Sequence, residues 1–230
     1  MREAVIVATA RTPIGKAYRG AFNNTDGPTL GGHAIKHAVQ RAGIAPDEVD
    51  DVVMGCAVQQ GTTGYNIGRL ASVAAGLPNT VAGMSMDRQC ASGMMAICTA
   101  AKQVISDNMD IVVGAGMESI SLVQNDHRNK FRTVDENVLA LSQHAYMPML
   151  QTAEVVAKRY GISREAQDEY SLQSQQRTAA AQAAGKFDDE IVPMESVMGV
   201  MNKETGEISY KNVKLEKDEG NRPETNIEDL

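Results

Sequence analysis

Residues 81–105 read VAGMSMDRQCASGMMAICTAAKQVI, and this stretch decides the fold class of the chain. The apolar residues of 81–86 suit a short buried strand, and those of 91–105 recur at the spacing of a helix. Between them lies a short polar turn that contains Cys90. A strand that passes directly into a helix is typical of α/β sheets.

The same alternation continues on both sides of this stretch. Three more short apolar runs suit strands: 3–10, 51–57 and 110–116. Two more segments have helical periodicity: 28–42 and 67–75. These helices stop at Gly43 and Gly76, which are good helix terminators. The order of elements predicts one α/β domain over residues 1–118, with a largely parallel sheet covered by helices.

The second part of the chain, residues 119–230, has a different character. Residues 119–150 are polar and irregular, and two predicted helices follow, at 152–160 and 163–184. Ser163 is a good N-cap for the longer helix, and Gly185 is a good C-terminal stop. Short apolar runs on both sides of 202–206 predict a hairpin. We expect this part to be an excursion from the sheet, not another α/β unit.

Composition excludes several classes of function. The net charge is −7 and no basic stripe is present, which argues against a nucleic-acid partner. No apolar run approaches the roughly 20 residues that span a membrane. Because the N-terminus also lacks a secretory signal, a cytoplasmic location is expected. Three cysteines without paired spacing predict neither a disulfide framework nor a zinc site.

Cys90 is the candidate for chemistry. We expect it near the first residue of its helix, at the carboxyl end of a parallel strand, where α/β sheets bind ligands. There the positive end of the helix stabilises a thiolate. The small residues Ala91, Ser92 and Gly93 let the backbone approach a substrate and offer N–H groups to an oxyanion. Such a thiolate suits acyl transfer between thioesters. The other two cysteines, Cys56 and Cys98, are interpreted as core packing.

The motifs of this chain resemble those of one family. Gln89-Cys90-Ala91-Ser92-Gly93-Met94 resembles the nucleophile signature of thiolases. Further segments resemble the same family in order along the chain: 10–16, 60–61 with 66–69, 114–121, 152–154, 163–168, and 185–187 with 190–191. The resemblance therefore covers essentially the whole sequence.

The resemblance implies a thiolase-like fold of two similar halves, each a five-stranded mixed sheet with flanking helices. Residues 1–118 correspond to the N-terminal α/β domain without its last strand. Residues 119–230 correspond to the loop domain that covers the site for coenzyme A (CoA). The second half of the fold is expected to be absent from this chain.

The resemblance also implies an acyl-CoA C-acyltransferase, which forms or cleaves 3-ketoacyl-CoA through an acyl-Cys90 intermediate. Thiolases take their histidine base and second cysteine from the second half, so the isolated chain is expected to be inactive. One alternative is an inactive fragment or split subunit that folds, dimerises and binds CoA weakly. Another is an enzyme like β-ketoacyl synthase, against which the Arg11-Thr12-Pro13 opening and the long loop domain argue.

Substrate contacts follow from the resemblance only in part. Met149 corresponds to the methionine that lines the acyl and pantetheine pocket, while Arg222 is a candidate contact for the CoA adenine or else a solvated linker charge. The expected substrates are CoA and acetyl-CoA, with no permanently bound cofactor and no metal. Expected partners are a second copy of the chain or a complementary C-terminal thiolase chain.

The four histidines do not match the setting of the thiolase base. His33 and His37 lie one turn apart on an early helix, a spacing that also suits a metal, although helix packing is the favoured interpretation. His127 and His144 fall in polar sequence and are expected to be solvated.

Overall fold

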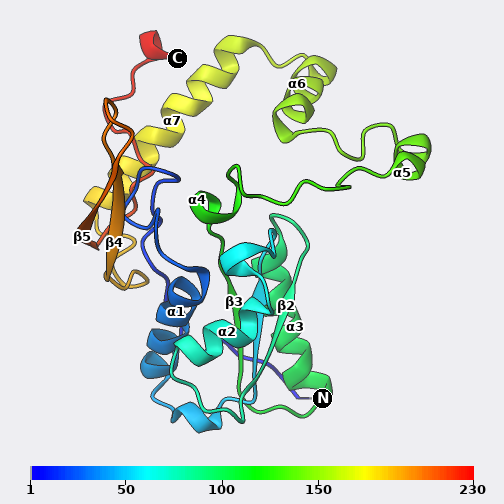
Figure 1. Cartoon of the computed structure of the whole chain (residues 1–230), viewed down its shortest axis with the longest axis vertical. Helices are drawn as coiled ribbons and strands as arrows, with labels where there is room; N and C mark the ends of the chain where they lie inside the picture. Colours follow the sequence, from blue (N-terminus) through cyan, green and yellow to red (C-terminus); the bar gives the residue numbers. More distant parts are fainter. Residues whose placement is uncertain (1) are drawn as a thin grey trace. The chain divides into compact units, whose positions relative to one another are not determined.

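The computed structural model describes residues 2–230 and divides into two compact units. The sheet unit comprises the residues up to 128 together with 188–220, and the helical unit comprises 129–187 and 221–230 (Figure 1). The predicted second domain, residues 119–230, is thus divided: 119–128 and 188–220 belong to the sheet unit, and the rest belongs to the helical unit. Its predicted role as a cover for the CoA site remains a prediction.

Three parallel strands form the sheet: β1 (Asp51–Gly55), β2 (Ala82–Met86) and β3 (Val112–Gly116). Their order is β2-β1-β3, and Val53 of β1 lies opposite Met84 on one side and Gly114 on the other. All five residues of β1 are buried. Pairing along both edges satisfies its backbone groups. Its apolar run lacks polar alternation because side chains on both faces of the strand enter a core.

Helices cover both faces of this sheet. They are α1 (Gly27–Ala42), α2 (Ile67–Ala74) and α3 (Ser92–Ser106). Val52 and Met54 of β1 join a cluster with residues of α1 and α2. Val53 joins Ala96 and Ala100 of α3 instead. Because successive side chains of a strand point to opposite faces, β1 serves two cores at once. The predicted α/β fold class is confirmed.

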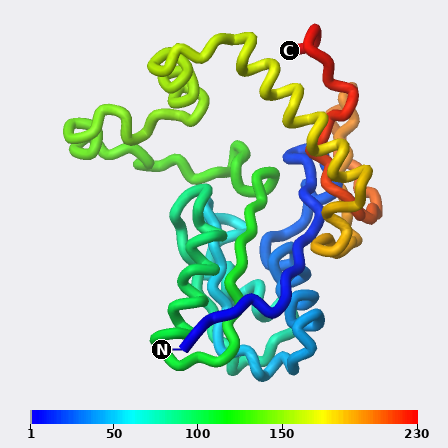
Figure 2. The backbone as a smooth tube through the Cα atoms, turned by 180° about the vertical axis from the view of Figure 1, so that it is seen from behind, coloured from blue at the N-terminus to red at the C-terminus, as the bar shows by residue number. Residues whose placement is uncertain are grey.

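The predicted strand over residues 3–10 is wrong. Figure 2 shows this segment as an extended stretch of chain. Within residues 2–230 it pairs with no strand of the sheet, so the sheet has three of the four predicted strands. Val5, Ile6 and Val7 are 76, 77 and 72 % exposed. In the described part of the chain, the outer edges of β2 and β3 carry no partner strand, and the segment pairs with neither of them. The end of the segment is held by an isolated parallel β-bridge between Arg11 and Ile191.

The predicted hairpin is confirmed as β4 (Met194–Met201) and β5 (Ile208–Leu215), which pair antiparallel. Its turn ends at Gly206, whose φ of 73° suits glycine. Met194 and Leu215, at the open end of the hairpin, pack with Ala21 and Phe22. Short helices complete the sheet unit: η1 (Pro46–Glu48), η2 (Gly61–Thr63) and α4 (Ile120–Val123).

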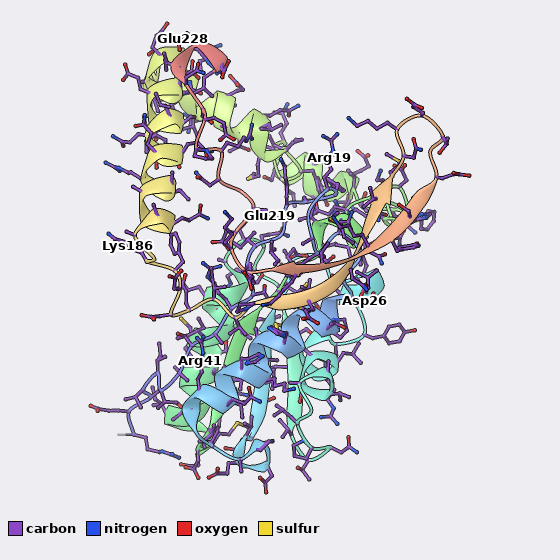
Figure 3. All side chains as sticks on the ribbon, turned by 90° about the vertical axis from the view of Figure 1, so that its left-hand side faces the viewer. Arg19, Asp26, Arg41, Lys186, Glu219 and Glu228 are labelled. Atoms are coloured by element: carbon purple, nitrogen blue, oxygen red, sulfur yellow. The ribbon has the colours of Figure 1, made fainter. Side chains whose placement is uncertain are left out.

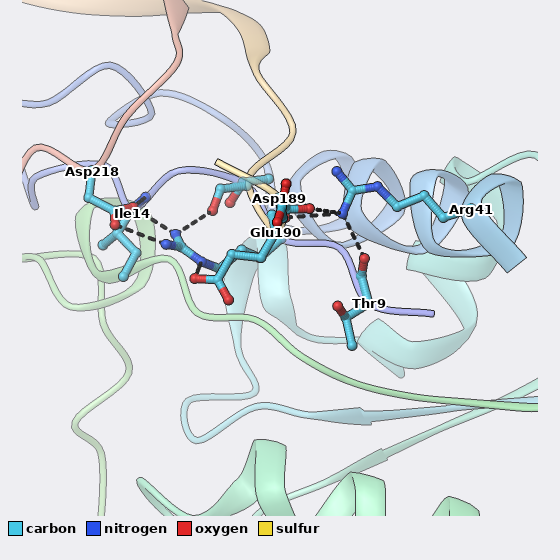
Figure 4. A network of polar contacts seen from close by, with 8 residues as sticks. Thr9, Ile14, Arg41, Asp189, Glu190 and Asp218 are labelled. Atoms are coloured by element: carbon cyan, nitrogen blue, oxygen red, sulfur yellow. Dashed lines mark hydrogen bonds and ion pairs between the residues drawn. The ribbon is translucent and has the colours of Figure 1, made fainter. Parts of the chain in front are cut away.

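A cluster of ionic and hydrogen-bonding groups, here called the Arg11 clamp, holds the two ends of the hairpin segment. Arg11 contacts Glu190 through Nε at 2.8 Å and Asp218 through Nη1 and Nη2 at 2.7 and 3.0 Å (Figure 4). Glu219, labelled in Figure 3, accepts hydrogen bonds from the amides of Lys16 and Ala21. The opening loop and both ends of segment 188–220 are therefore fastened at one place.

The helical unit contains α5 (Glu136–Leu141), α6 (Met149–Tyr160), α7 (Arg164–Ala183) and η3 (Ile227–Asp229). Both predicted helices are confirmed, and α5 is an additional short one. Ser163 caps α7 by accepting a hydrogen bond from the Ala166 amide at 3.2 Å, and Gly185 has the left-handed φ of 66°. None of these four helices contains a buried residue.

Candidate active site

Cys90 lies on the turn that joins β2 to α3, at the carboxyl end of the parallel sheet. The helix begins at Ser92 with Ala91 as its N-cap, so Cys90 precedes the helix by one residue more than predicted. The side chain of Cys90 is exposed. The turn therefore presents a thiol at the edge where the strands end, beside the N-terminus of α3.

The backbone of this turn is left-handed at Gln89, with a φ of 48°. Such values are disfavoured for residues that carry a Cβ, and the surrounding bonds must hold them. Asp87 Oδ1 accepts a hydrogen bond from the Gln89 amide at 2.7 Å. The Ala91 amide donates to the Arg88 carbonyl at 3.1 Å, which closes the turn just before the helix.

Ser92 supplies the inner brace of the turn. Its Oγ accepts a hydrogen bond from the Arg88 amide at 2.8 Å and donates one to the Gln89 carbonyl at 2.6 Å. The residue is only 4 % exposed. One hydroxyl thus uses both of its capacities, as donor and as acceptor, on the two residues that precede Cys90.

Glycines allow α3 to start against the strand ends. A Cβ on Gly55, at the end of β1, would lie 2.2 Å from the Ser92 carbonyl carbon. A Cβ on Gly116, at the end of β3, would lie 3.0 Å from the Gly93 Cα. A side chain at Gly55 would therefore displace the start of α3 and with it the turn that carries Cys90.

Cys56 follows β1 and, unlike the exposed Cys90, is buried. It is 1 % exposed, as predicted, and its Sγ lies 3.7 Å from Glu118 Oε1. Burial, reinforced by the Glu118 charge, raises the pKa of the Cys56 thiol to about 11. Glu118 Oε2 also accepts a hydrogen bond from the Ala57 amide at 2.8 Å. Cys56 is therefore a protonated core thiol at neutral pH.

The predicted burial of Cys98 is wrong, because its side chain is exposed. The face of α3 that packs on the sheet carries Ala96 and Ala100. Cys98 is two residues from each of them, which on a helix is about 200° of rotation. It therefore points away from β1.

The histidines are confirmed as helix-packing or solvated residues. The rings of His33 and His37 on α1 have centroids 4.6 Å apart and are tilted by 56°. Burial lowers the pKa of both, and the backbone of Val192 and Pro193 adjoins His33. His127 and His144 are exposed. Within residues 2–230, no three His, Cys, Asp or Glu side chains are grouped to hold a metal.

The two predicted CoA contacts both lie in the helical unit. Met149 is the first residue of α6 and is 70 % exposed. Arg222 is exposed, and its amide donates to Gln175 Oε1 on α7 at 2.8 Å. Asn221 Nδ2 donates to the same Oε1 at 2.9 Å. The backbone of Arg222 is thus anchored on α7, which leaves its side chain on the surface.

Two further residues contribute to this region beyond those predicted from the sequence. The sequence pattern marks Ser92 only as a small residue, although a serine at the start of a helix often bonds nearby backbone. Glu118 stands out in the sequence only as part of a motif, and its bond to Ala57 joins residues 61 positions apart. No local pattern signals that second contact.

Comparison with known proteins gives one consistent result. The family model described as "Thiolase, N-terminal domain" matches residues 4–230. Within residues 2–230, no helix combines the length and the apolar character that crossing a membrane requires.

Two curated relatives illustrate the match. The "3-ketoacyl-CoA thiolase" of Bacillus subtilis is 39 % identical over 100 % of this chain and 58 % of its own length. The "Acetyl-CoA acetyltransferase" of Cupriavidus necator is 40 % identical over 84 % of this chain and 51 % of its own. The chain therefore spans about half the length of the curated relatives it matches.

A solved structure agrees with these sequences. The crystal structure of the Bacillus anthracis acetyl-CoA acetyltransferase matches with a TM-score of 0.79 and 34 % identity. The match covers 100 % of this chain and 57 % of that one.

Proposed function

This chain belongs to the thiolase family, and on that premise we propose that it supplies the nucleophile of an acyl-CoA C-acyltransferase that forms or cleaves 3-ketoacyl-CoA. The observation that carries the proposal is the exposed Cys90 on the turn into α3, within the segment QCASGM. The raised pKa of Cys56 makes that cysteine a poor nucleophile.

The proposed reaction begins with attack of the Cys90 thiolate on the thioester carbonyl of acetyl-CoA. A bond forms between Sγ and the acyl carbon, the bond from that carbon to the CoA sulfur breaks, and CoA leaves with the proton that Cys90 has lost. The N-terminus of α3 favours the negative charge on Sγ. Because one thioester replaces another, the step is readily reversible, as both synthesis and cleavage require.

The second stage of the reaction is proposed to need groups outside the matched N-terminal domain. The resemblance assigns the base and the second cysteine to a complementary C-terminal thiolase segment. Assembly into dimers or tetramers is likewise part of the proposal, as the family resemblance implies. A cytoplasmic location also remains a prediction.

Contacts to CoA are proposed for Met149 and Arg222. Both side chains are exposed in the helical unit, and the backbone of Arg222 is anchored on α7. Thermal stabilisation by CoA is expected to fall in Arg222→Ala. It should stay unchanged in Arg159→Ala, which removes an exposed arginine from α6 of the same unit. Equal stabilisation of both variants by CoA would contradict the proposed contact between Arg222 and CoA.

The test of the nucleophile is intact mass after brief exposure of the chain to acetyl-CoA. We expect a gain of one acetyl group that disappears in Cys90→Ala and persists in Cys98→Ser, which removes the other exposed thiol. The absence of an adduct on a folded chain would contradict acylation by this chain alone. Stabilisation by CoA without an adduct would favour the alternative of an inactive module that binds CoA weakly.

A further inference from the structure

We infer that Ser92 is a positioning residue for Cys90, whose hydroxyl holds the left-handed backbone of Gln89 and thereby keeps the thiol at the N-terminus of α3. This inference rests on the proposed nucleophilic role of Cys90. It goes beyond that role because Ser92 itself contacts no reacting atom in the proposed step.

Hydrogen bonds of Ser92 tie the turn to the start of α3. The Ser92 Oγ joins the Arg88 amide and the Gln89 carbonyl, so it links the two residues before Cys90 to the first residue of α3. The Gln89 carbonyl also accepts the Ser92 amide at 3.1 Å. Loss of the hydroxyl would leave the Arg88 amide without this partner in a partly buried place, which favours rearrangement of the turn.

The backbone of Gln89 needs such a brace. A residue with a Cβ adopts a φ of 48° only where its surroundings enforce it. Asp87, the other side chain that bonds this residue, is exposed, whereas Ser92 is buried. Water can replace an exposed hydrogen-bond partner more readily than a buried one. Ser92 is therefore the brace whose loss releases the turn.

The test compares the labelling rate of Cys90 by iodoacetamide with that of Cys98, an exposed thiol of the same helix region that serves as internal reference. Peptide mass spectrometry resolves the two rates in one sample. In Ser92→Ala we expect the Cys90 to Cys98 rate ratio to fall about tenfold, because the turn no longer holds Cys90 beside the N-terminus of α3. Acetylation of Cys90 by acetyl-CoA should fall by at least the same factor.

Two rescue variants separate positioning from general stabilisation. Glycine tolerates positive φ, so adding Gln89→Gly to Ser92→Ala should recover most of the labelling rate. Ser92→Thr keeps a hydroxyl and should stay within a few-fold of the wild type. A matched control is Ser72→Ala, which removes a buried hydroxyl that has no hydrogen-bond partner within residues 2–230 and should leave the ratio unchanged.

The outcomes divide cleanly. An unchanged ratio in folded Ser92→Ala, or a loss that Gln89→Gly does not recover, would overturn the inference. If Ser92→Ala fails to fold, Ser92→Thr decides: a retained ratio supports the hydroxyl's role, and a tenfold loss in the folded variant contradicts it. A wild-type chain that acetyl-CoA does not acetylate would instead contradict acylation by this chain alone, which is part of the proposed function, since the labelling ratio tests the brace without acyl transfer.

Discussion

In the sheet unit the central strand β1 has no exposed residue, whereas none of the four helices of the helical unit contains a buried one. The sheet unit therefore has the apolar burial that stabilises a fold. The helical unit has local stabilisation instead, such as the Ser163 cap and the Arg164–Asp168 ion pair. Regular helices therefore form even in a unit whose helices contain no buried residue. Substitutions in the two units should therefore differ in their effect on stability.

Truncation in the two units should have very different consequences. Met54→Ala removes a fully buried side chain from β1 and is expected to cost about 2–5 kcal/mol of unfolding free energy. Leu150→Ala removes a side chain that is 84 % exposed on α6 and should change stability by less than about 0.5 kcal/mol. Denaturant unfolding measures both, and similar losses would contradict the assignment of the core to the sheet unit.

The Arg11 clamp should contribute less than the core. Burial alone would raise the pKa of Asp218, but hydrogen bonds from Arg11 and the Ile14 amide outweigh it, so its pKa lies below the usual range. A depressed pKa means that the clamp stabilises the fold above about pH 4 and that this stabilisation is lost as pH falls through the folded-state pKa. Asp218→Asn should cost about 1–3 kcal/mol at neutral pH.

The control for the clamp is Asp126→Asn, an exposed aspartate of the same unit. Urea unfolding from pH 3 to pH 7 should show a weaker pH dependence in Asp218→Asn than in wild type, and no such change in the control. Equal pH profiles for all three proteins would show that the clamp adds nothing to stability.

Removal of the α7 cap should affect the helical unit selectively. Ser163→Ala leaves the Ala166 amide without its side-chain partner and is expected to cost about 1 kcal/mol. Hydrogen exchange should accelerate in α7 and stay unchanged in β1. Ser171→Ala is a useful comparison, because that hydroxyl bonds within the helix to the Gln167 carbonyl and caps nothing. Faster exchange in β1 would show that the two units unfold together.

The smallest effect should come from the histidine pair on α1. Burial lowers the pKa of His33 and His37 from 6.5, so the unfolded state takes up protons at higher pH than the folded one. The resulting stabilisation is present above about pH 6.5 and declines as pH falls. His33→Gln should flatten this decline between pH 7.5 and pH 5, whereas His144→Gln, at an exposed position, should not. A steeper decline in His33→Gln would contradict the burial argument.

Much of the fold near the candidate site was predictable because its signals are local. Apolar runs and helical periodicity placed β1, β2, β3 and the three sheet-packed helices within a few residues of their observed bounds. The hairpin and the Ser163 cap followed from turn and capping chemistry, which also acts over a few residues. Cys90 was identified in the same way, from a strand–helix junction with small residues behind it.

Sequence alone thus determined the family, the order of elements and the cysteine on the turn, since periodicity, turn chemistry and motifs are written in consecutive residues. Only the tertiary structure decided which apolar segments are buried. Residues 3–10 carry a strand-like pattern, but within residues 2–230 they pair with no strand of the sheet and their apolar side chains stay exposed. Cysteine is a residue type that is commonly buried, but Cys98 is exposed, because its burial depends on what packs against its face of α3. The Arg11 clamp and the Glu118 contact likewise join distant positions, so their energies arise only when the folded chain brings them together.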